Sequence, residues 1–208
     1  MLSNYRLGDI ILQDHKLLHP EMLTDHPTTI GSDYVLSHDK SDRIGLATQI
    51  VLMHTEKYKH LFPPDIEYST VVHLRLGDAV GGAHFFERRL RPFVPSYYQS
   101  IVPESNVYVI GKCHFGKGDS STNGNYINES STNYDECIKL SNSYMENVLH
   151  LLKATHFDGG HPDIDLCFAV KAKYFIQGRG FYSKLIVQIR KRLGLISIEA
   201  PSHDWSIK

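Results

Sequence analysis

The sequence predicts an α/β fold, with a Rossmann-like parallel sheet that carries helices on both faces. Thr70–His73 is a short apolar run rich in β-branched residues, as in a strand buried on both faces, and it breaks directly into the polar turn Leu74–Asp78. Other short apolar runs alternate along the chain with segments of helical periodicity, which is the pattern of βαβ units. A glycine-rich turn, Gly178–Ser183, separates one such run from the helix that follows it.

Two elements are expected before this sheet. Asp9–Leu12 has the composition of a strand, and Ser41–His60 is typical of a capped helix because apolar residues recur along one side of it. At 208 residues the chain is long enough for one sizeable domain with a small appendage, but too short for two complete Rossmann domains. We therefore divide it into a short N-terminal segment, residues 1–65, and an α/β domain, residues 66–208.

The middle of the chain predicts a strand, a loop, a helix and a second strand. The strands are Asn106–Ile110 and Thr155–Phe157, and the helix between them is Asp135–Ala154, with its apolar residues on one side. Gly116–Asn133 is dense in Gly, Ser, Thr and Asn, so we expect an exposed loop there. This loop is either a lid over a ligand, part of a second binding site, or an inert insertion.

The last third of the chain predicts a helix, a strand, a turn and a second helix. Pro162–Ala172 begins with proline and two aspartates, which suit the positive end of a helix. Tyr174–Ile176 is a short buried strand, Gly178–Ser183 is the turn, and Lys184–Leu193 is a helix that stops at Gly194. This last helix carries Arg190, Lys191 and Arg192 near its negative end, where basic residues are favoured.

Two features at the strand ends are candidates for anion binding. Arg75 follows the first strand of the sheet, and its guanidinium is a permanently charged fork of donors that matches phosphate oxygens. The alternative is a structural ion pair with Asp78. The amino end of the last helix, preceded by two glycines and carrying Ser183, offers unpaired backbone N–H groups and the helix dipole.

These two blocks resemble the donor-binding domain of the fucosyltransferase superfamily, which includes the α1,2-, α1,6- and protein O-fucosyltransferases. The first block runs from His73 to Asp78 and is similar to the H-V-R-R-G-D motif of α1,2-type enzymes, with Leu76 in place of the second arginine. The second block runs from Asp165 to Ser183 and aligns with an Asp-Leu pair followed, about a dozen residues later, by a small-residue turn. The resemblance implies a GT-B type glycosyltransferase with GDP-fucose as donor.

The resemblance also implies roles for individual residues. His73 and Asp165 would contact the guanine or ribose end of the donor, and Arg75 would contact its pyrophosphate. The donor-binding turn, which would hold the β-phosphate, comprises Gly178, Gly180, Phe181, Tyr182 and Ser183.

The implied reaction is a metal-independent transfer of a sugar, expected to be fucose, from a GDP-sugar to a hydroxyl of a glycan or protein acceptor, with inversion. Arg75 would stabilise the departing nucleotide. The candidate bases for the acceptor hydroxyl are Asp78, His84 and Glu87, and the sequence does not rank them.

Two other functions fit parts of the sequence. One is a catalytically silent module that binds a nucleotide sugar or a glycan, which Leu76 and the short N-terminal segment favour. The other is an NAD-dependent oxidoreductase, because Gly178-x-Gly180-x-x-Ser183 with Glu199 further on imitates a dinucleotide fingerprint. Against the second, the motif lies where no sheet is expected to remain to complete a first mononucleotide-binding half.

Composition narrows the class of protein further. The formal net charge is -1 and there is no basic excess, so a nucleic-acid partner is not expected. No apolar run approaches the ~20 residues of a membrane span, and the first residues lack a signal-peptide pattern. We therefore expect no stable membrane insertion and a cytoplasmic location, the alternative being a luminal fragment of a secretory-pathway enzyme.

We expect no metal ion and no cofactor apart from the donor substrate. His15 and His19 have the spacing of two ligands on a helix, but no glutamate or third ligand accompanies them. The sequence gives no indication of oligomeric state.

Overall fold

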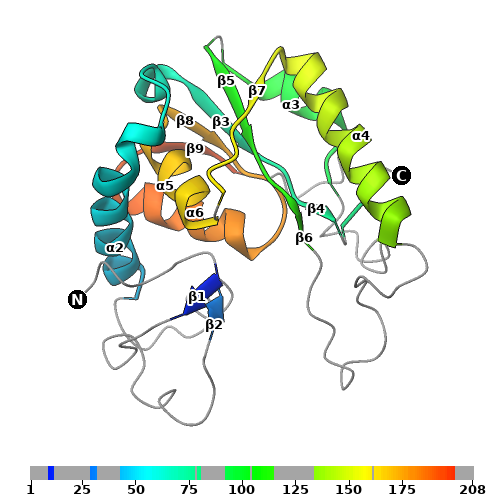
Figure 1. The fold of residues 1–208 in the computed structure, drawn as a ribbon. Helices are drawn as coiled ribbons and strands as arrows, with labels where there is room; N and C mark the ends of the chain where they lie inside the picture. The colour runs from blue at the N-terminus through cyan, green and yellow to red at the C-terminus, as the bar shows by residue number, and fades with distance from the viewer. Residues whose placement is uncertain are drawn as a thin grey trace. The chain divides into compact units, whose positions relative to one another are not determined.

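The computed structural model describes residues 9–11, 29–31, 43–77, 79–80, 92–103, 105–114, 134–160 and 162–199. Within them the chain forms an α/β fold around a five-stranded parallel sheet, in the order β7-β5-β3-β8-β9 (Figure 1). The predicted α/β class is thus confirmed. The strands are β3 (Thr70–His73), β5 (Val107–Ile110), β7 (Thr155–His156), β8 (Tyr174–Ile176) and β9 (Ile196–Ile198).

Helices alternate with these strands along the chain, as the sequence predicted. α3 (Pro95–Ile101) comes between β3 and β5, and α4 (Tyr134–Leu152) between β5 and β7. α5 (Pro162–Lys171) comes between β7 and β8, and α6 (Phe181–Arg192) between β8 and β9. The predicted strand at Tyr174–Ile176 has the bounds that the structure gives to β8.

The direction in which the chain builds the sheet reverses at one place. From β3 the chain adds β5 and then β7 on one side, in parallel register with Thr70 opposite Val107 and Tyr108 opposite Thr155. It then returns to the other side of β3, where it adds β8 and β9. The reversal therefore lies between β3, which leads into the first motif block, and β8, which lies within the second.

The chain forms two compact units, each assembled from separate stretches. Unit 1 contains residues 1–69, 158–175 and 181–197, and unit 2 contains residues 70–157, 176–180 and 198–208. The short turn at 176–180 thus belongs to the same unit as β3, although the residues on either side of it in the chain belong to unit 1.

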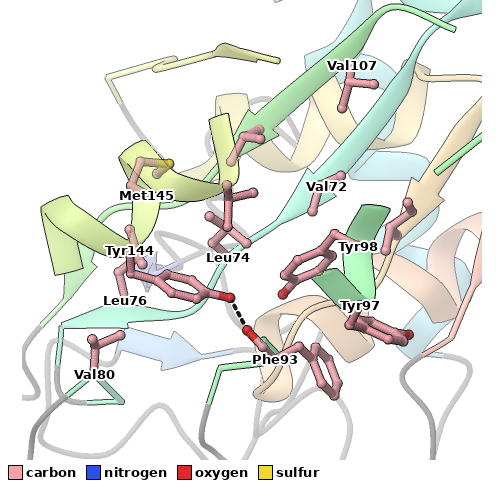
Figure 2. Packing of buried hydrophobic residues seen from close by; sticks show 13 residues of the cluster. Val72, Leu74, Leu76, Val80, Phe93, Tyr97, Tyr98, Val107, Tyr144 and Met145 are labelled. Atoms are coloured by element: carbon pink, nitrogen blue, oxygen red, sulfur yellow. Dashed lines mark hydrogen bonds between the residues drawn. The ribbon is translucent and has the colours of Figure 1, made fainter. Parts of the chain in front are cut away.

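The core of unit 2 is a cluster of apolar and aromatic side chains from its strands and helices (Figure 2). Val72 and Val109 lie on the sheet, and both are fully buried. α3 and α4 pack against each other and contribute Tyr98 and Tyr144. The hydroxyl of Tyr144 donates a hydrogen bond of 2.6 Å to the backbone carbonyl of Phe93, which ties this ring-bearing residue to α4.

A second, two-stranded sheet extends the first motif block in unit 2. β4 (Leu76–Gly77) pairs in parallel with β6 (Cys113–His114). The N–H of Gly77 donates to Oγ of Ser141 on α4 at 2.9 Å. Leu76 is buried in the apolar cluster, so this position faces the core rather than a ligand.

Unit 1 is built around three helices that lie side by side (Figure 1). α2 (Arg43–Tyr58) packs against α5 and α6, and it covers most of the helix predicted for Ser41–His60. Its buried side includes the predicted apolar residues Ala47, Ile50 and Val51. Unit 1 also contains the antiparallel pair β1 (Asp9–Ile11) and β2 (Thr29–Gly31) and two short 3-10 helices, η4 (Lys59–Leu61) and η5 (Ile66–Tyr68).

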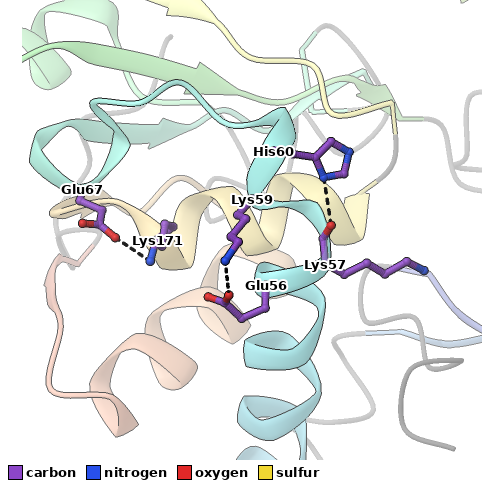
Figure 3. Close-up of polar contacts among 6 residues, drawn as sticks. All are labelled: Glu56, Lys57, Lys59, His60, Glu67 and Lys171. Carbon is purple, nitrogen blue, oxygen red and sulfur yellow. Dashed lines mark hydrogen bonds and ion pairs between the residues drawn. The ribbon is translucent and has the colours of Figure 1, made fainter.

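The surface of unit 1 carries local polar contacts near the end of α2 (Figure 3). Lys59 forms an ion pair of 2.8 Å with Glu56, and both side chains are more than 60% exposed. Lys171, the last residue of α5, forms an ion pair of 2.6 Å with Glu67 of η5. Exposed pairs of this kind add little stability because water screens them.

Arg190 lies in the last turn of α6, as predicted, but its side chain acts on another helix. The side chain is fully buried, and its guanidinium donates to the carbonyls at the end of α5. The acceptors are the carbonyls of Ala169 at 2.7 Å, Val170 at 3.1 Å, Ala172 at 2.8 Å, Lys173 at 3.0 Å and Ile196 at 2.6 Å, and Oγ of Ser197 at 3.2 Å.

Candidate functional site

The two motif blocks meet within unit 2, at the carboxyl ends of β3 and β8. A methyl group built on Gly178 would lie 2.2 Å from the carbonyl oxygen of His73 and 2.8 Å from its ring Nδ1. A methyl group built on Gly180 would lie 2.8 Å from Nη1 of Arg75. Only glycine permits approaches this close. The turn after β8 therefore rests directly on the backbone of His73 and on the guanidinium of Arg75.

This meeting point lies where the strand order reverses. In open parallel sheets, the helices that follow the two strands on either side of a reversal diverge, which leaves a crevice outside the carboxyl ends of those strands. β3 and β8 are the two strands at the reversal, and Arg75 and Gly180 follow them. The topology thus places the candidate residues where sheets of this kind bind ligands.

His73 carries a neutral imidazole. Its side chain is buried, and burial together with the neighbouring charge of Arg75 lowers its pKa to about 3. A neutral ring can donate one hydrogen bond and accept another, whereas a protonated ring can only donate. At neutral pH the ring therefore adds no second positive charge beside Arg75.

Arg75 is partly buried, and its Nε is shielded from solvent. The side chain lies against Gly180, whose φ of 88° is in the left-handed region that favours glycine. Because the guanidinium contacts the residue directly before α6, the turn conformation and the position of this cation depend on each other.

The last helix begins earlier than the sequence predicted. α6 runs from Phe181, so Phe181, Tyr182 and Ser183 lie in its first turn and not in the turn that the sequence predicts before it. The left-handed glycine at position 180 already ends the turn, and nothing in the next three residues opposes helix formation. Ser183 is buried in this first turn.

Tyr182 and Asp165 make contacts inside unit 1. The hydroxyl of Tyr182 donates a hydrogen bond to the carbonyl of Pro162, the first residue of α5. Burial, followed by the nearby carboxylates of Asp165 and Asp163, raises the pKa of Tyr182 well above its usual value. Oδ1 of Asp165 accepts a hydrogen bond of 2.9 Å from the N–H of Gly159. Both side chains thus hold the segment where α5 begins.

Several sequence predictions fall outside the described residues. These are the candidate bases Asp78, His84 and Glu87, the loop Gly116–Asn133, and the histidine pair His15 and His19.

One residue of the turn was missed by the sequence analysis. The guanidinium of Arg179, between Gly178 and Gly180, lies 4.0 Å from the centre of the Phe93 ring. The only signal in the sequence was a cation flanked by two glycines, and no pattern links it to an aromatic residue so far away along the chain.

A hollow of about 660 Å³ lies in unit 1, but it contains none of the predicted site residues. Its lining comes from α2, from the end of α5 and from the segment between α6 and β9, and includes Leu52, Lys171, Leu193 and Ile196. Lys171 comes shortly before β8, and Leu193 and Ile196 lie before and at the start of β9, so the hollow lies at the amino ends of these strands. Ligands in such sheets bind at the opposite, carboxyl ends.

No family model matches this sequence, and neither does any curated protein sequence. Among the described residues, no three His, Cys, Asp or Glu side chains gather as metal ligands would. None of the helices in the described part of the chain is long and apolar enough to cross a membrane.

Proposed function

We propose that this chain is the donor-binding part of a GT-B type glycosyltransferase that takes a GDP-activated sugar, with fucose as the expected sugar. In this proposal the five-stranded sheet is a Rossmann-like nucleotide-binding sheet, and the reversal between β3 and β8 is the donor site. The acceptor is a hydroxyl of a glycan or a protein.

The observation that carries the proposal is the contact between Arg75 and Gly180. The two sequence blocks that resemble the fucosyltransferase superfamily are far apart in the chain, yet Arg75 of the first lies against Gly180 of the second. A structural ion pair of Arg75 with Asp78 would not require Arg75 to lie against Gly180. A site that binds one diphosphate with both blocks does require this contact.

The chemistry follows from charge. Loss of a nucleoside diphosphate from a sugar leaves negative charge on the diphosphate and positive charge on the sugar. The fork of Arg75 can bind the phosphate oxygens. Because the guanidinium lies against Gly180, it is preorganised and stabilises the departing group at little cost in reorganisation.

A dinucleotide site at the same turn is less well supported. From the sequence, the objection was that no sheet remains after the motif to complete a mononucleotide-binding half, which needs three strands. In the described part of the chain, one strand, β9 (Ile196–Ile198), follows α6. The structure adds a second objection. In a dinucleotide fingerprint the second glycine lets the cofactor approach the backbone, but the space beside Gly180 is filled by Arg75.

A silent binding module is favoured by one observation. Leu76, at the position of the second arginine in α1,2-type enzymes, is buried in the core of unit 2 and supplies no charge. Such a module would bind GDP and GDP-fucose, but would neither hydrolyse nor transfer the sugar.

Calorimetric titration with GDP, GDP-fucose, UDP and NAD separates a GDP-sugar site from a dinucleotide site. We expect saturable binding of GDP and GDP-fucose only. Arg75→Ala should weaken GDP binding at least about tenfold, since a lost charge-assisted hydrogen bond costs roughly 1.5 kcal/mol or more. Lys191→Ala removes an equal charge from an exposed position at the other end of α6 and serves as the matched control.

Two results would contradict the proposal. One is GDP affinity that is the same in Arg75→Ala and in the wild-type protein. The other is binding of NAD in preference to GDP. Release of free fucose or its transfer to an acceptor hydroxyl, measured with wild-type protein, distinguishes the enzyme from the silent module.

A further inference from the structure

The turn between β8 and α6 carries a second arginine that lies on an aromatic ring of the unit 2 core. Cζ of Arg179 lies 4.0 Å from the centroid of the Phe93 ring, well inside the range of cation–π contacts. Arg179 stands between Gly178 and Gly180, the two glycines that contact His73 and Arg75. The ring therefore holds the middle of the turn whose two ends form the candidate donor site.

Phe93 is a firmly fixed partner for this contact. Its side chain is fully buried, and its ring lies 4.5 Å from the Tyr97 ring and 6.0 Å from the Tyr98 ring, between centroids. Its backbone carbonyl accepts the 2.6 Å hydrogen bond from Tyr144 that Figure 2 shows. Side chain and backbone are thus both held by the core, and the ring is a rigid platform for a cation.

The electrostatic surroundings agree with a cation at this place. Burial raises the pKa of Tyr97 and of Tyr98, and the positive charge of Arg179 opposes both shifts. The charge of Arg179 therefore acts on both tyrosines, and its guanidinium lies over the face of Phe93. An arginine suits this environment better than lysine, because its planar guanidinium stacks on a ring and is only weakly hydrated.

A turn with two glycines needs such an anchor. Glycine has the largest conformational freedom of all residues in the unfolded chain and so loses the most on folding. Gly178 and Gly180 bring no side chain with which to hold their own conformation. Arg179 is the residue between them, and its stack on Phe93 restricts the turn from within.

We propose that Arg179 is a positioning residue for diphosphate binding. Stacked on Phe93, it holds Gly178–Gly180 in the conformation that sets Arg75 and leads into the amino end of α6. This inference rests on the proposed function, since it names what positions the donor site. It predicts that a contact remote from the ligand controls affinity for the diphosphate part of GDP.

A double-mutant cycle on GDP affinity tests this inference. The variants are Arg179→Gln, Phe93→Leu and the double variant. Each single variant should weaken GDP binding roughly tenfold, the scale of a desolvated cation–π contact. Guanosine, which has no phosphate, should lose less than about twofold by the same reasoning. Lys139→Gln, on an exposed position of α4 in the same unit, controls for the loss of one positive charge and should have no such effect.

The double variant separates positioning from direct contact. If Arg179 acts through Phe93, the double variant should bind GDP about as tightly as the single variant with the lower GDP affinity, because the second substitution removes nothing further. If Arg179 instead touches the phosphate, Arg179→Gln weakens binding by the same factor in both backgrounds, and the inference is overturned. Single variants that bind GDP as tightly as the wild-type protein would overturn it as well.

Amide hydrogen exchange keeps this test separate from the proposed function. If wild-type protein binds no GDP, the proposed function fails, but the effect of the Arg179–Phe93 stack on the turn can still be measured. Arg179→Gln leaves the core side chains in place, so it should speed amide exchange across residues 177–180 while exchange in α4 stays unchanged. Unchanged exchange at 177–180 would show that the stack on Phe93 does not hold the turn.

Discussion

Replacing Arg190 with methionine would remove the group that satisfies the end of α5. Methionine keeps the length and much of the volume of the side chain, but it carries no donor. Five backbone carbonyls and one hydroxyl would lose their partner in this single change. Burial lowers the pKa of Arg190 to about 10, so the guanidinium is charged at neutral pH and its hydrogen bonds are charge-assisted.

The cost follows from which of these acceptors water can reach. The three bonds from Nη1, to Ala169, Val170 and Ala172, are buried, whereas the other three are partly exposed. Nη1 carries two N–H groups, so its three bonds amount to two full ones, and at roughly 1.5 kcal/mol for each buried, charge-assisted bond the loss is about 3 kcal/mol. Burial of the apolar methionine side chain would offset roughly 1 kcal/mol of this loss. We expect a net loss of roughly 2 kcal/mol, a substantial part of the stability of an ordinary domain.

Urea unfolding, followed by circular dichroism, measures this loss as a shift in the midpoint at constant slope. Lys191→Met, next in the chain and exposed, is the matched control and should change stability by less than about 0.5 kcal/mol. The loss of stability for Arg190→Lys should lie between these two values, because one ammonium group cannot reach the acceptors at the end of α5 and those in β9 at the same time. A loss below about 1 kcal/mol for Arg190→Met at unchanged slope would refute this account of the helix end.

Two further changes concern the candidate site. Because the pKa of His73 is about 3 in the folded protein but near 6.5 when unfolded, only the unfolded state takes up this proton between these values. The free energy of unfolding should therefore fall as the pH drops below 6.5, by roughly 2–3 kcal/mol at pH 4.5. His73→Asn should lose this part of the pH dependence. His60→Asn, at an exposed histidine, should retain it. Gly178→Ala should cost roughly 3 kcal/mol in urea unfolding because its methyl group meets a backbone oxygen. Gly194→Ala, at a φ of 70° in open space, should cost only about 1 kcal/mol; equal losses for the two glycines would show that the clash at His73 is relieved without cost.

Much of the fold could be predicted from local pattern. The apolar runs at β3, β5 and β8 and the periodicity of α2 identify their elements, because strands and helices bury side chains with different periods. The contact between Arg75 and the glycine turn was also foreseeable, since both follow strands and the carboxyl ends of parallel strands share one edge of the sheet.

The remaining features depend on tertiary contacts that no local pattern records. A basic residue near the end of a helix predicts an interaction with that helix, yet Arg190 serves the end of α5 because its long side chain reaches a neighbouring element. The stack of Arg179 on Phe93 joins two segments that are far apart in the chain. Gly178 and Gly180 could be recognised as turn residues, but not as residues whose missing side chains make room for His73 and Arg75.

The interleaving of the two units decides how this protein can be divided for experiments. No single cut yields either unit intact, because residues 158–197 supply helices to unit 1 and the turn 176–180 to unit 2. A fragment that ends near residue 157 would keep Arg75 but lose the glycines against which it lies. Contacts between such distant stretches also slow folding, since long loops must close before their contacts form. Circular permutants that keep both residues 70–157 and the turn 176–180 are therefore better suited than truncations for studying the nucleotide site.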